Sequence, residues 1–141
     1  MRHVVFRLEK ERYALPLGAV REVVVPPAGY SRVPRAPVAV RGVMNLRGRV
    51  VTVVDMRPLY GLAPEEAPSS LQRIILLDRG RRDLGLLVTD VDGIEMIEKV
   101  VPLQGAPKLS VRGLSRLKGW AVTVLDPEGV DGLVNSLFAP R

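Results

Sequence analysis

The chain has 141 residues, of which 47% are apolar and 26% are charged, and its formal net charge is +6. The apolar fraction is that of a chain that folds around a core, which excludes an intrinsically disordered protein. The sequence has no cysteine and a single histidine, His3. It therefore excludes disulfides and thiolate metal sites, and argues against a histidine zinc site or a serine–histidine triad.

The first part of the sequence predicts a β-hairpin followed by an irregular segment. Residues 3–9 alternate polar and apolar side chains, as a half-buried strand does, and residues 13–17 repeat this pattern after a charged turn at 9–12. Residues 18–27 are compatible with either a short helical turn or a strand. Two prolines make residues 31–40 a loop or an extended edge segment.

The middle of the sequence predicts two further hairpins. We expect strands at 41–46 and 49–55 with a tight turn between them, and a short helical turn that starts at Pro58. Residues 72–78 and 83–91 are expected to form the next hairpin.

The remaining segments are short and lack a long amphipathic helix. Residues 61–70 form a polar loop, 93–104 continue as extended chain, 120–126 form a final strand, and the tail at 132–141 has one or two helical turns. Short strands separated by turns predict an all-β barrel or sandwich, because an α/β fold needs longer helices between its strands.

The sequence contains an internal repeat. Residues 40–62 and 111–133 share 11 identities in 23 positions aligned without a gap. Self-similarity of this kind indicates a structural duplication. We therefore expect one domain over residues 1–141, built from two similar β subdomains. They are expected to share a core, since a unit of about 70 residues buries a modest fraction of its surface alone.

Residues kept in both copies of the repeat are predicted to be structural. Gly42 and Gly48, with their counterparts 71 residues later, would allow a positive φ or a close backbone approach. Asp55 and its counterpart, Asp126, are expected to cap the turn that follows each strand.

Among the positions that differ between the copies, we interpret two, 45 and 47, as functional candidates that escape the duplication. Asn45 is replaced by Arg116, and Arg47 is replaced by Lys118.

No catalytic set is found in the sequence. Phosphate-binding glycine loops and zinc-protease motifs are absent, and the aspartates are too dispersed for a calcium loop. The carboxylate pairs at 65–66 and at 90 and 92 lie in predicted loops, where a solvated face is the simpler interpretation. We predict a non-enzyme that has no cofactor and no metal.

The positive charge leaves nucleic-acid binding open as an alternative. Against it, the arginines are scattered, only four lysines accompany them, and aromatic residues make up 4% of the chain, which leaves few rings for base stacking. No segment resembles a signal peptide or reaches the length of a membrane span, so we expect a soluble cytoplasmic protein.

The stretch VRGVMNLRGRVVTVVDMR, at residues 40–57, resembles the hallmark motif of the CheW-like domain family. The matching positions are Val40, Arg41, Gly42, Asn45, Leu46, Arg47, Gly48, Asp55, Met56 and Arg57. Weaker blocks at 6–24 and 73–94 are also similar to this family, so the resemblance covers nearly the whole chain.

The resemblance implies a fold of two five-stranded SH3-like β-barrels that share a hydrophobic core. It implies a non-catalytic adaptor in a bacterial chemosensory pathway of the two-component type. Such adaptors couple the cytoplasmic tip of methyl-accepting chemoreceptors to the histidine kinase CheA, through the CheW-like regulatory domain of the kinase. They are cytoplasmic and recruited to membrane-associated receptor arrays, with no cofactor, no nucleic acid and no insertion into the membrane.

The resemblance also implies where partners bind. The residues matching a receptor-binding groove are Arg47, Gly85, Val91 and Ile94. The residues matching a kinase-binding surface are Val20, Glu22, Gly42 and Gly48, and Asn45 is a further contact candidate. Structural interpretations stay open: Val91 and Ile94 also suit core positions, and Glu22 suits an ordinary surface carboxylate. Arg47 could instead hold its own turn by bonding to a carbonyl or to Asp55.

The sequence departs from the family pattern at two places. Thr52 stands where the family commonly has proline, and members often carry a longer C-terminal helix than the tail of this chain. A shorter helix would expose part of the core or change an interface. A variant adaptor that binds only one of the usual partners is therefore another alternative.

Overall fold

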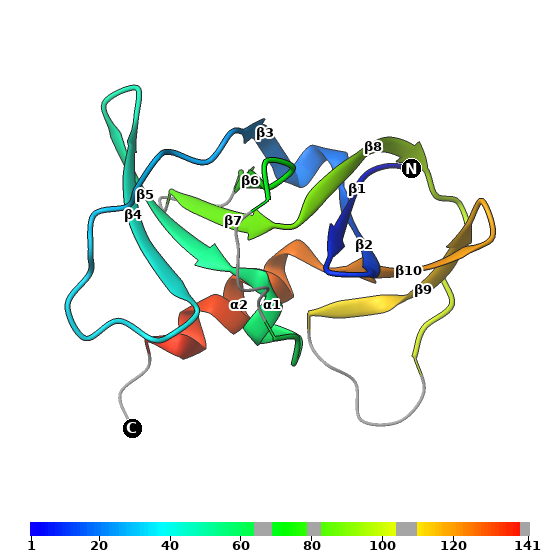
Figure 1. Ribbon diagram of the computed structural model, residues 1–141. Coiled ribbons are helices and arrows are strands. Elements are labelled where there is room, and N and C mark those ends of the chain that lie inside the picture. Colours follow the sequence, from blue (N-terminus) through cyan, green and yellow to red (C-terminus); the bar gives the residue numbers. More distant parts are fainter. Residues whose placement is uncertain (64–68, 79–82, 104–109, 139–141) are drawn as a thin grey trace.

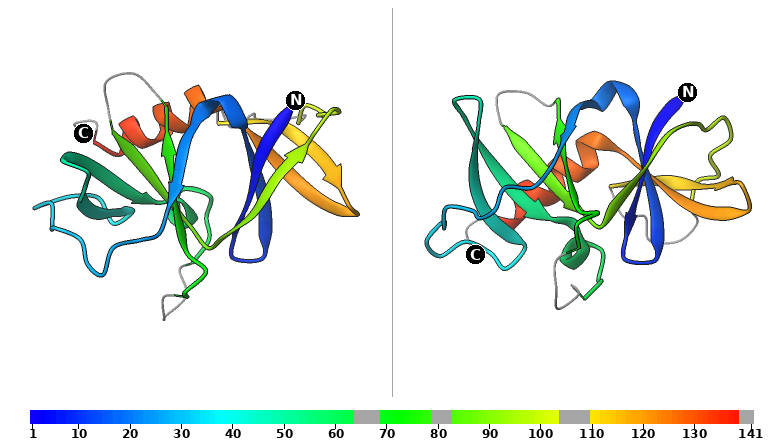
Figure 2. Two further views of the ribbon diagram at one scale, coloured as in Figure 1. Left: turned by 90° about the horizontal axis from the view of Figure 1, so that it is seen from above. Right: turned by 45° about the horizontal axis from the view of Figure 1, so that its top comes forward.

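The computed structural model describes residues 1–63, 69–78, 83–103 and 110–138. These residues form ten strands in two five-stranded sheets, one 3-10 turn and two helices. The two sheets lie side by side as two lobes, and the C-terminal helix runs from one lobe toward the other (Figures 1 and 2). The predicted all-β class is confirmed.

The strands of each sheet come from separate parts of the chain. The first sheet has the order β3 (Val20–Val24), β6 (Arg73–Leu77), β7 (Leu84–Val88), β5 (Arg49–Asp55), β4 (Val40–Leu46). The second sheet has the order β8 (Asp90–Met96), β1 (Arg2–Leu8), β2 (Glu11–Pro16), β10 (Trp120–Leu125), β9 (Val111–Leu117). The helical elements are η1 (Leu17–Ala19), α1 (Met56–Leu59) and α2 (Pro127–Leu137).

One hydrophobic core is shared by the two sheets. Phe6 of the second sheet, Ile75 and Leu86 of the first, and Val130 and Val134 of α2 belong to the same buried cluster. The two valines are four residues apart and therefore lie on one face of the helix. Each sheet has in addition a smaller cluster of its own. The predicted shared core is thus confirmed.

Several predicted boundaries are wrong. The strand expected at 83–91 is divided: β7 belongs to the first sheet, and β8 starts at Asp90 in the second sheet. The chain changes sheets at Thr89, whose N–H donates to the carbonyl of Arg7 at 3.0 Å. No glycine or proline lies between residues 86 and 92, so the sequence carries no turn signal at this crossing.

The helical segments also differ from the prediction. The tail forms an eleven-residue helix rather than one or two turns, because Pro127 starts it early and its valines pack on the shared core. The first helix begins at Met56, before Pro58. Residues 18–27 contain both expected alternatives, a 3-10 turn and then β3. Parts of the predicted elements, at 64–68, 79–82, 104 and 139–141, lie outside the described residues.

The two copies of the repeat occupy corresponding places in the two sheets. β4–β5–α1 lies at the edge of the first sheet as β9–β10–α2 lies at the edge of the second. The inner strand of each hairpin pairs in parallel with its neighbour, β5 with β7 and β10 with β2. We propose that the duplication of one β subdomain produced this correspondence.

The predicted close backbone approach occurs at Gly42 and Gly113. A Cβ atom there would lie 2.5 Å from the carbonyl oxygen of Ser31 and 2.2 Å from that of Val101, respectively. In each sheet this contact lets an incoming segment form an antiparallel bridge to the outer strand of the hairpin. Any larger residue at these two positions would therefore clash with the backbone of the incoming segment.

The two aspartates that end the hairpins have different roles. Asp55 caps α1 by accepting the N–H of Arg57 at 3.0 Å, as predicted. Asp126 makes no side-chain cap to α2, so the prediction for this copy is wrong. Its carboxylate instead accepts from Arg112 at 3.4 Å.

Candidate functional site

The turn between β4 and β5 has two central residues in the left-handed region. The φ of Arg47 is 51° and that of Gly48 is 84°. Such pairs of positive φ values are typical of the tight turns that match strand twist. The side chain of Asn45 holds this turn, since its Oδ1 accepts the N–H of Gly48 at 2.9 Å. Asn45, predicted as a contact candidate, is exposed and also has this local structural role.

Arg47 and Glu22, which were assigned to two different partners, lie together. The Arg47 guanidinium forms an ion pair with the Glu22 carboxylate, and their side chains are 68% and 32% exposed. Because Glu22 lies on β3 and Arg47 follows β4, the pair joins the two outer strands of the first sheet. The interpretation that Arg47 bonds to Asp55 is wrong, since Asp55 pairs with Arg57 instead.

A second acidic centre lies beside this pair. Asp83 accepts from Arg49 at 2.6 Å and from Arg21 at 3.3 Å. The tip surface, as we name it, consists of Arg21, Glu22, Arg47, Arg49 and Asp83. Sequence analysis missed Arg21, Arg49 and Asp83, because ion pairs between residues 34 and 62 positions apart leave no pattern in the sequence.

The other predicted kinase-binding residues differ in their surroundings. Val20 is partly buried and packs against the shared core. Gly42 is buried under the segment that contains Ser31, whereas Gly48 is exposed at the turn. Of the four predicted residues, Gly48 is exposed, Val20 and Glu22 are partly buried, and Gly42 is buried.

The structure separates the predicted receptor-binding residues from one another. Ile94 is 58% exposed on β8, whereas Val91 faces the shared core and is partly buried. Gly85 is buried in β7, where a Cβ atom would lie 2.7 Å from Ile74. No hydrogen bond or ion pair among the described residues joins any of them to Arg47. The core interpretation therefore holds for Val91 and not for Ile94.

The ion pair at the hairpin tip recurs in the second sheet. Lys118 has a φ of 52° and donates to Glu95 of β8 at 2.8 Å. The expectation that position 47 escapes the duplication is therefore wrong in structural terms, because both copies place a cation there against a glutamate of the opposite edge strand. Beside it, Arg12 lies 3.9 Å above the ring of Trp120, which is 56% exposed.

A buried ion cluster connects the two lobes. Arg57 is 5% exposed and binds Asp55 at 2.8 Å and Glu9, in the β1–β2 turn of the second sheet, at 2.7 Å. The hydrogen bond to Asp55, with that to Glu9, raises the pKa of Arg57 above its usual value in spite of burial. This cluster holds charges in place and leaves no free base or acid for catalysis.

The carboxylates considered for acid–base chemistry do not form a pair. Asp92 forms ion pairs with two arginines at 2.9 and 3.3 Å, whereas Asp90 accepts the N–H of Val91. Glu65 and Glu66 lie outside the described residues. The described residues contain no group of three side chains placed to hold a metal ion. None of their helices is long and apolar enough to cross a membrane.

Comparisons with known proteins agree on one family. Residues 2–132 match the model of the CheW-like domain. The chain is 31% identical over 99 residues to the chemotaxis protein CheW of Helicobacter pylori, and this alignment covers 63% of the chain and 59% of that protein. It is 30% identical over 110 residues to a probable chemotaxis protein CheW of Rhizobium etli, covering 76% and 67%. The chain thus spans less than two thirds of the first of these relatives.

The fold also matches a solved structure. The scaffolding protein TtCheW of Thermoanaerobacter tengcongensis superposes with a TM-score of 0.80 and 25% identity, over 89% of this chain and 88% of that one. This match confirms the predicted fold of two SH3-like barrels, which correspond to the two five-stranded sheets.

Proposed function

The chain belongs to the CheW-like domain family, and from this premise we propose that it is a non-catalytic adaptor between methyl-accepting chemoreceptors and the histidine kinase CheA. The observation that carries the proposal is the match of residues 2–132 to the family model, together with a fold shared with a protein described as a scaffold. The relatives described as chemotaxis proteins support the same pathway. The adaptor would act in the cytoplasm, at receptor arrays on the membrane.

We propose the tip surface as the contact for the CheW-like regulatory domain of the kinase. This proposal moves Arg47 from the receptor-binding set that the resemblance implied to the kinase contact, because Arg47 pairs with Glu22. The Arg47–Glu22 pair is accessible, and a guanidinium can bind a carboxylate of a partner with two parallel hydrogen bonds. Val20, Gly42 and Gly48 would shape this surface. Asn45 would act by holding the turn that presents Arg47.

We propose that the receptor tip contacts β8 through Ile94. An amphipathic helix binds through apolar side chains on one face, and Ile94 with its neighbour Met96 offers such a contact, with exposures of 58% and 51%. Val91 and Gly85 would support the groove from inside. Single contacts of this size are weak, so function would depend on many linked copies in an array.

No observation favours the nucleic-acid alternative. The cations of the tip surface and Lys118 are paired with carboxylates. Such pairing lowers the attraction for phosphates.

The proposal is tested by co-sedimentation with receptor-containing membranes and purified kinase. We expect the wild-type chain to sediment with both, Arg47→Ala to lose kinase, and Ile94→Asp to lose receptor. Arg112→Ala is the matched control, because its exposed ion pair, 3.4 Å from Asp126, includes neither Arg47 nor Ile94. Unchanged sedimentation of the two variants would contradict the sites, and failure of the wild-type chain would contradict the adaptor role.

A further inference from the structure

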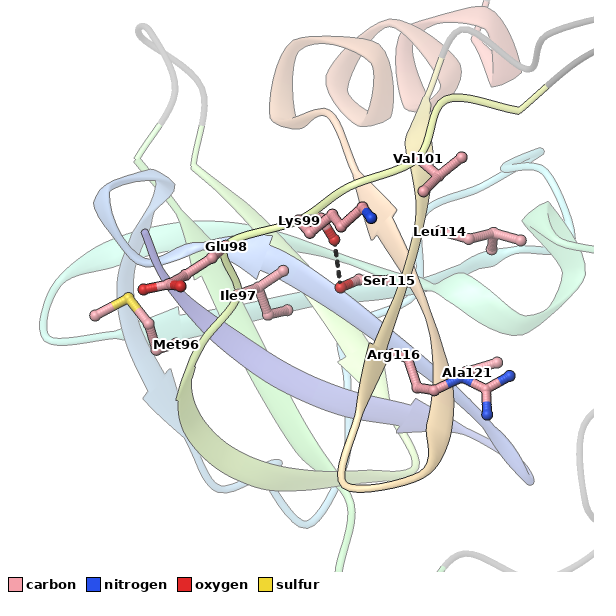
Figure 3. A pocket seen from close by; sticks show the side chains of 9 residues that line it. All are labelled: Met96, Ile97, Glu98, Lys99, Val101, Leu114, Ser115, Arg116 and Ala121. Carbon is pink, nitrogen blue, oxygen red and sulfur yellow. Dashed lines mark hydrogen bonds between the residues drawn. The ribbon is translucent and has the colours of Figure 1, made fainter.

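The second sheet has a hollow between its two outer strands, β8 and β9. The chain leaving β8 bonds first to the N-terminal residue, where the N–H of Ile97 donates to the carbonyl of Met1 at 3.0 Å. It then reaches β9, where Val101 and Leu114 exchange two hydrogen bonds of 2.8 Å. Between these points lies the edge hollow, about 720 Å³ in volume and lined by Ile97, Val101, Leu114, Ser115 and Ala121 among others (Figure 3).

The corresponding place in the first sheet is filled. There Met44 is 8% exposed and packs with Val24 and Tyr30, whereas its counterpart 71 residues later is Ser115. The edge hollow therefore lies where the second copy of the repeat has a serine in place of a buried methionine.

The backbone of β9 has an unpaired position beside the edge hollow. Leu114 bonds outward to Val101, so two residues further along the strand the N–H and C=O of Arg116 point to the same side. Lys99 is the residue that would pair with Arg116 next, but its carbonyl accepts the hydroxyl of Ser115 at 2.7 Å (Figure 3). No backbone hydrogen bond to Arg116 on this side is found among the described residues.

The border of the edge hollow has unpaired positive charge. Lys99 and Arg116 form no ion pair with any residue in the part of the chain that the structure describes. Among the described residues that line it, the one carboxylate is that of Glu98, which lies at the far end beside Met96, away from Arg116 (Figure 3). Arg116 is also the position at which the two copies differ in chemistry, since its counterpart Asn45 holds a turn.

We propose that the edge hollow binds an extended acidic segment of a partner protein, which adds a short strand to β9 at Arg116. Main-chain hydrogen bonds to an exposed strand would supply part of the affinity. Side chains of an extended segment alternate between two faces, so one apolar side chain can enter the hollow while its acidic neighbours lie near Lys99 and Arg116. This inference goes beyond the adaptor proposal and does not depend on it.

The test is an NMR titration of the isotope-labelled full chain with a short, end-capped peptide of alternating leucine and glutamate. We expect saturable shifts at residues 97–101 and 114–121, and slower hydrogen exchange of the Arg116 amide by about tenfold or more. Ser115→Met, which introduces the residue of the other copy, should weaken binding about tenfold or more, because it fills the place of one leucine side chain. Val50→Ala, in the first sheet, should leave binding unchanged.

Several results would overturn the proposal. One is equal binding by Ser115→Met while its thermal unfolding shows an intact fold. A second is equal binding of a peptide with lysine in place of glutamate. A third is an Arg116 amide whose exchange does not change when the peptide binds. If dilution of the free chain shifts the same amides, the occupant is a second copy of this chain, and the acidic segment is the wrong assignment.

Discussion

Removal of Arg57 should destabilise the protein strongly, because its guanidinium joins the two lobes. Arg57→Ala removes the hydrogen bonds from the side chain to Asp55 and to Glu9 and leaves two carboxylates without their cation. Asp55 is 3% exposed, so water cannot replace the lost partner without rearrangement. Breaking a buried pair on one side costs about 3–5 kcal/mol in the free energy of unfolding.

The structure places the expected loss near the lower end of this range. Asp55 keeps the hydrogen bond from the backbone N–H of residue 57, and the Glu9 side chain, at 17% exposure, can reach water. We therefore expect a loss of about 3 kcal/mol, which corresponds to a decrease of about 10 °C in Tm for a chain of this length. Urea unfolding monitored by circular dichroism measures this loss of free energy.

Two comparisons make this prediction specific. Arg57→Lys keeps the positive charge but not the forked geometry of the guanidinium. Its free energy of unfolding should therefore fall by about half as much as that of Arg57→Ala. Arg112→Ala breaks an exposed pair and should cost less than about 0.5 kcal/mol. A loss of under about 1 kcal/mol for Arg57→Ala would refute the reasoning that the buried cluster holds the lobes together.

Three further predictions follow from individual contacts. Burial lowers the pKa of His3 below 6.5. As the pH falls through this value, the unfolded chain takes up a proton that the folded chain does not, so the free energy of unfolding decreases by up to about 1.4 kcal/mol per pH unit. Urea unfolding at pH 7 and pH 5 should therefore show a smaller decrease for His3→Gln than for the wild-type chain. Gly113→Ala should cost about 1–3 kcal/mol, because its Cβ meets a backbone carbonyl at 2.2 Å, whereas Gly18→Ala, which meets nothing within 4 Å, should be nearly neutral in the same assay. Arg47→Ala should change the free energy of unfolding by less than about 1 kcal/mol while it lowers kinase binding, since its ion pair is exposed.

Local patterns in the sequence predicted much of the fold. The alternation of apolar residues and the glycine turn at 47–48 identified the β4–β5 hairpin almost to the residue. The repeat relates this hairpin to β9–β10 of the second sheet, although no strand was predicted where β9 lies. The crossing at Thr89 was missed, because no glycine or proline marks it and a strand pattern cannot show which sheet a strand joins.

The candidate site was less predictable, because its contacts join distant parts of the chain. Nothing in the sequence indicates that Arg47 would meet Glu22 rather than Asp55. The role of Asn45 did leave a signal, since an asparagine three residues before a glycine is a pattern that can hold a tight turn. The replacement of Met44 by Ser115 is also visible in the repeat, but only the structure shows that it leaves a hollow.

The adaptor role is tested most directly by a pull-down from an extract of the source organism, with the full chain as bait and mass spectrometry of the retained proteins. The account predicts retention of a histidine kinase with a CheW-like domain and of a methyl-accepting chemoreceptor, with the kinase lost when Arg47→Ala is the bait. Retention of neither protein by the wild-type chain would contradict it.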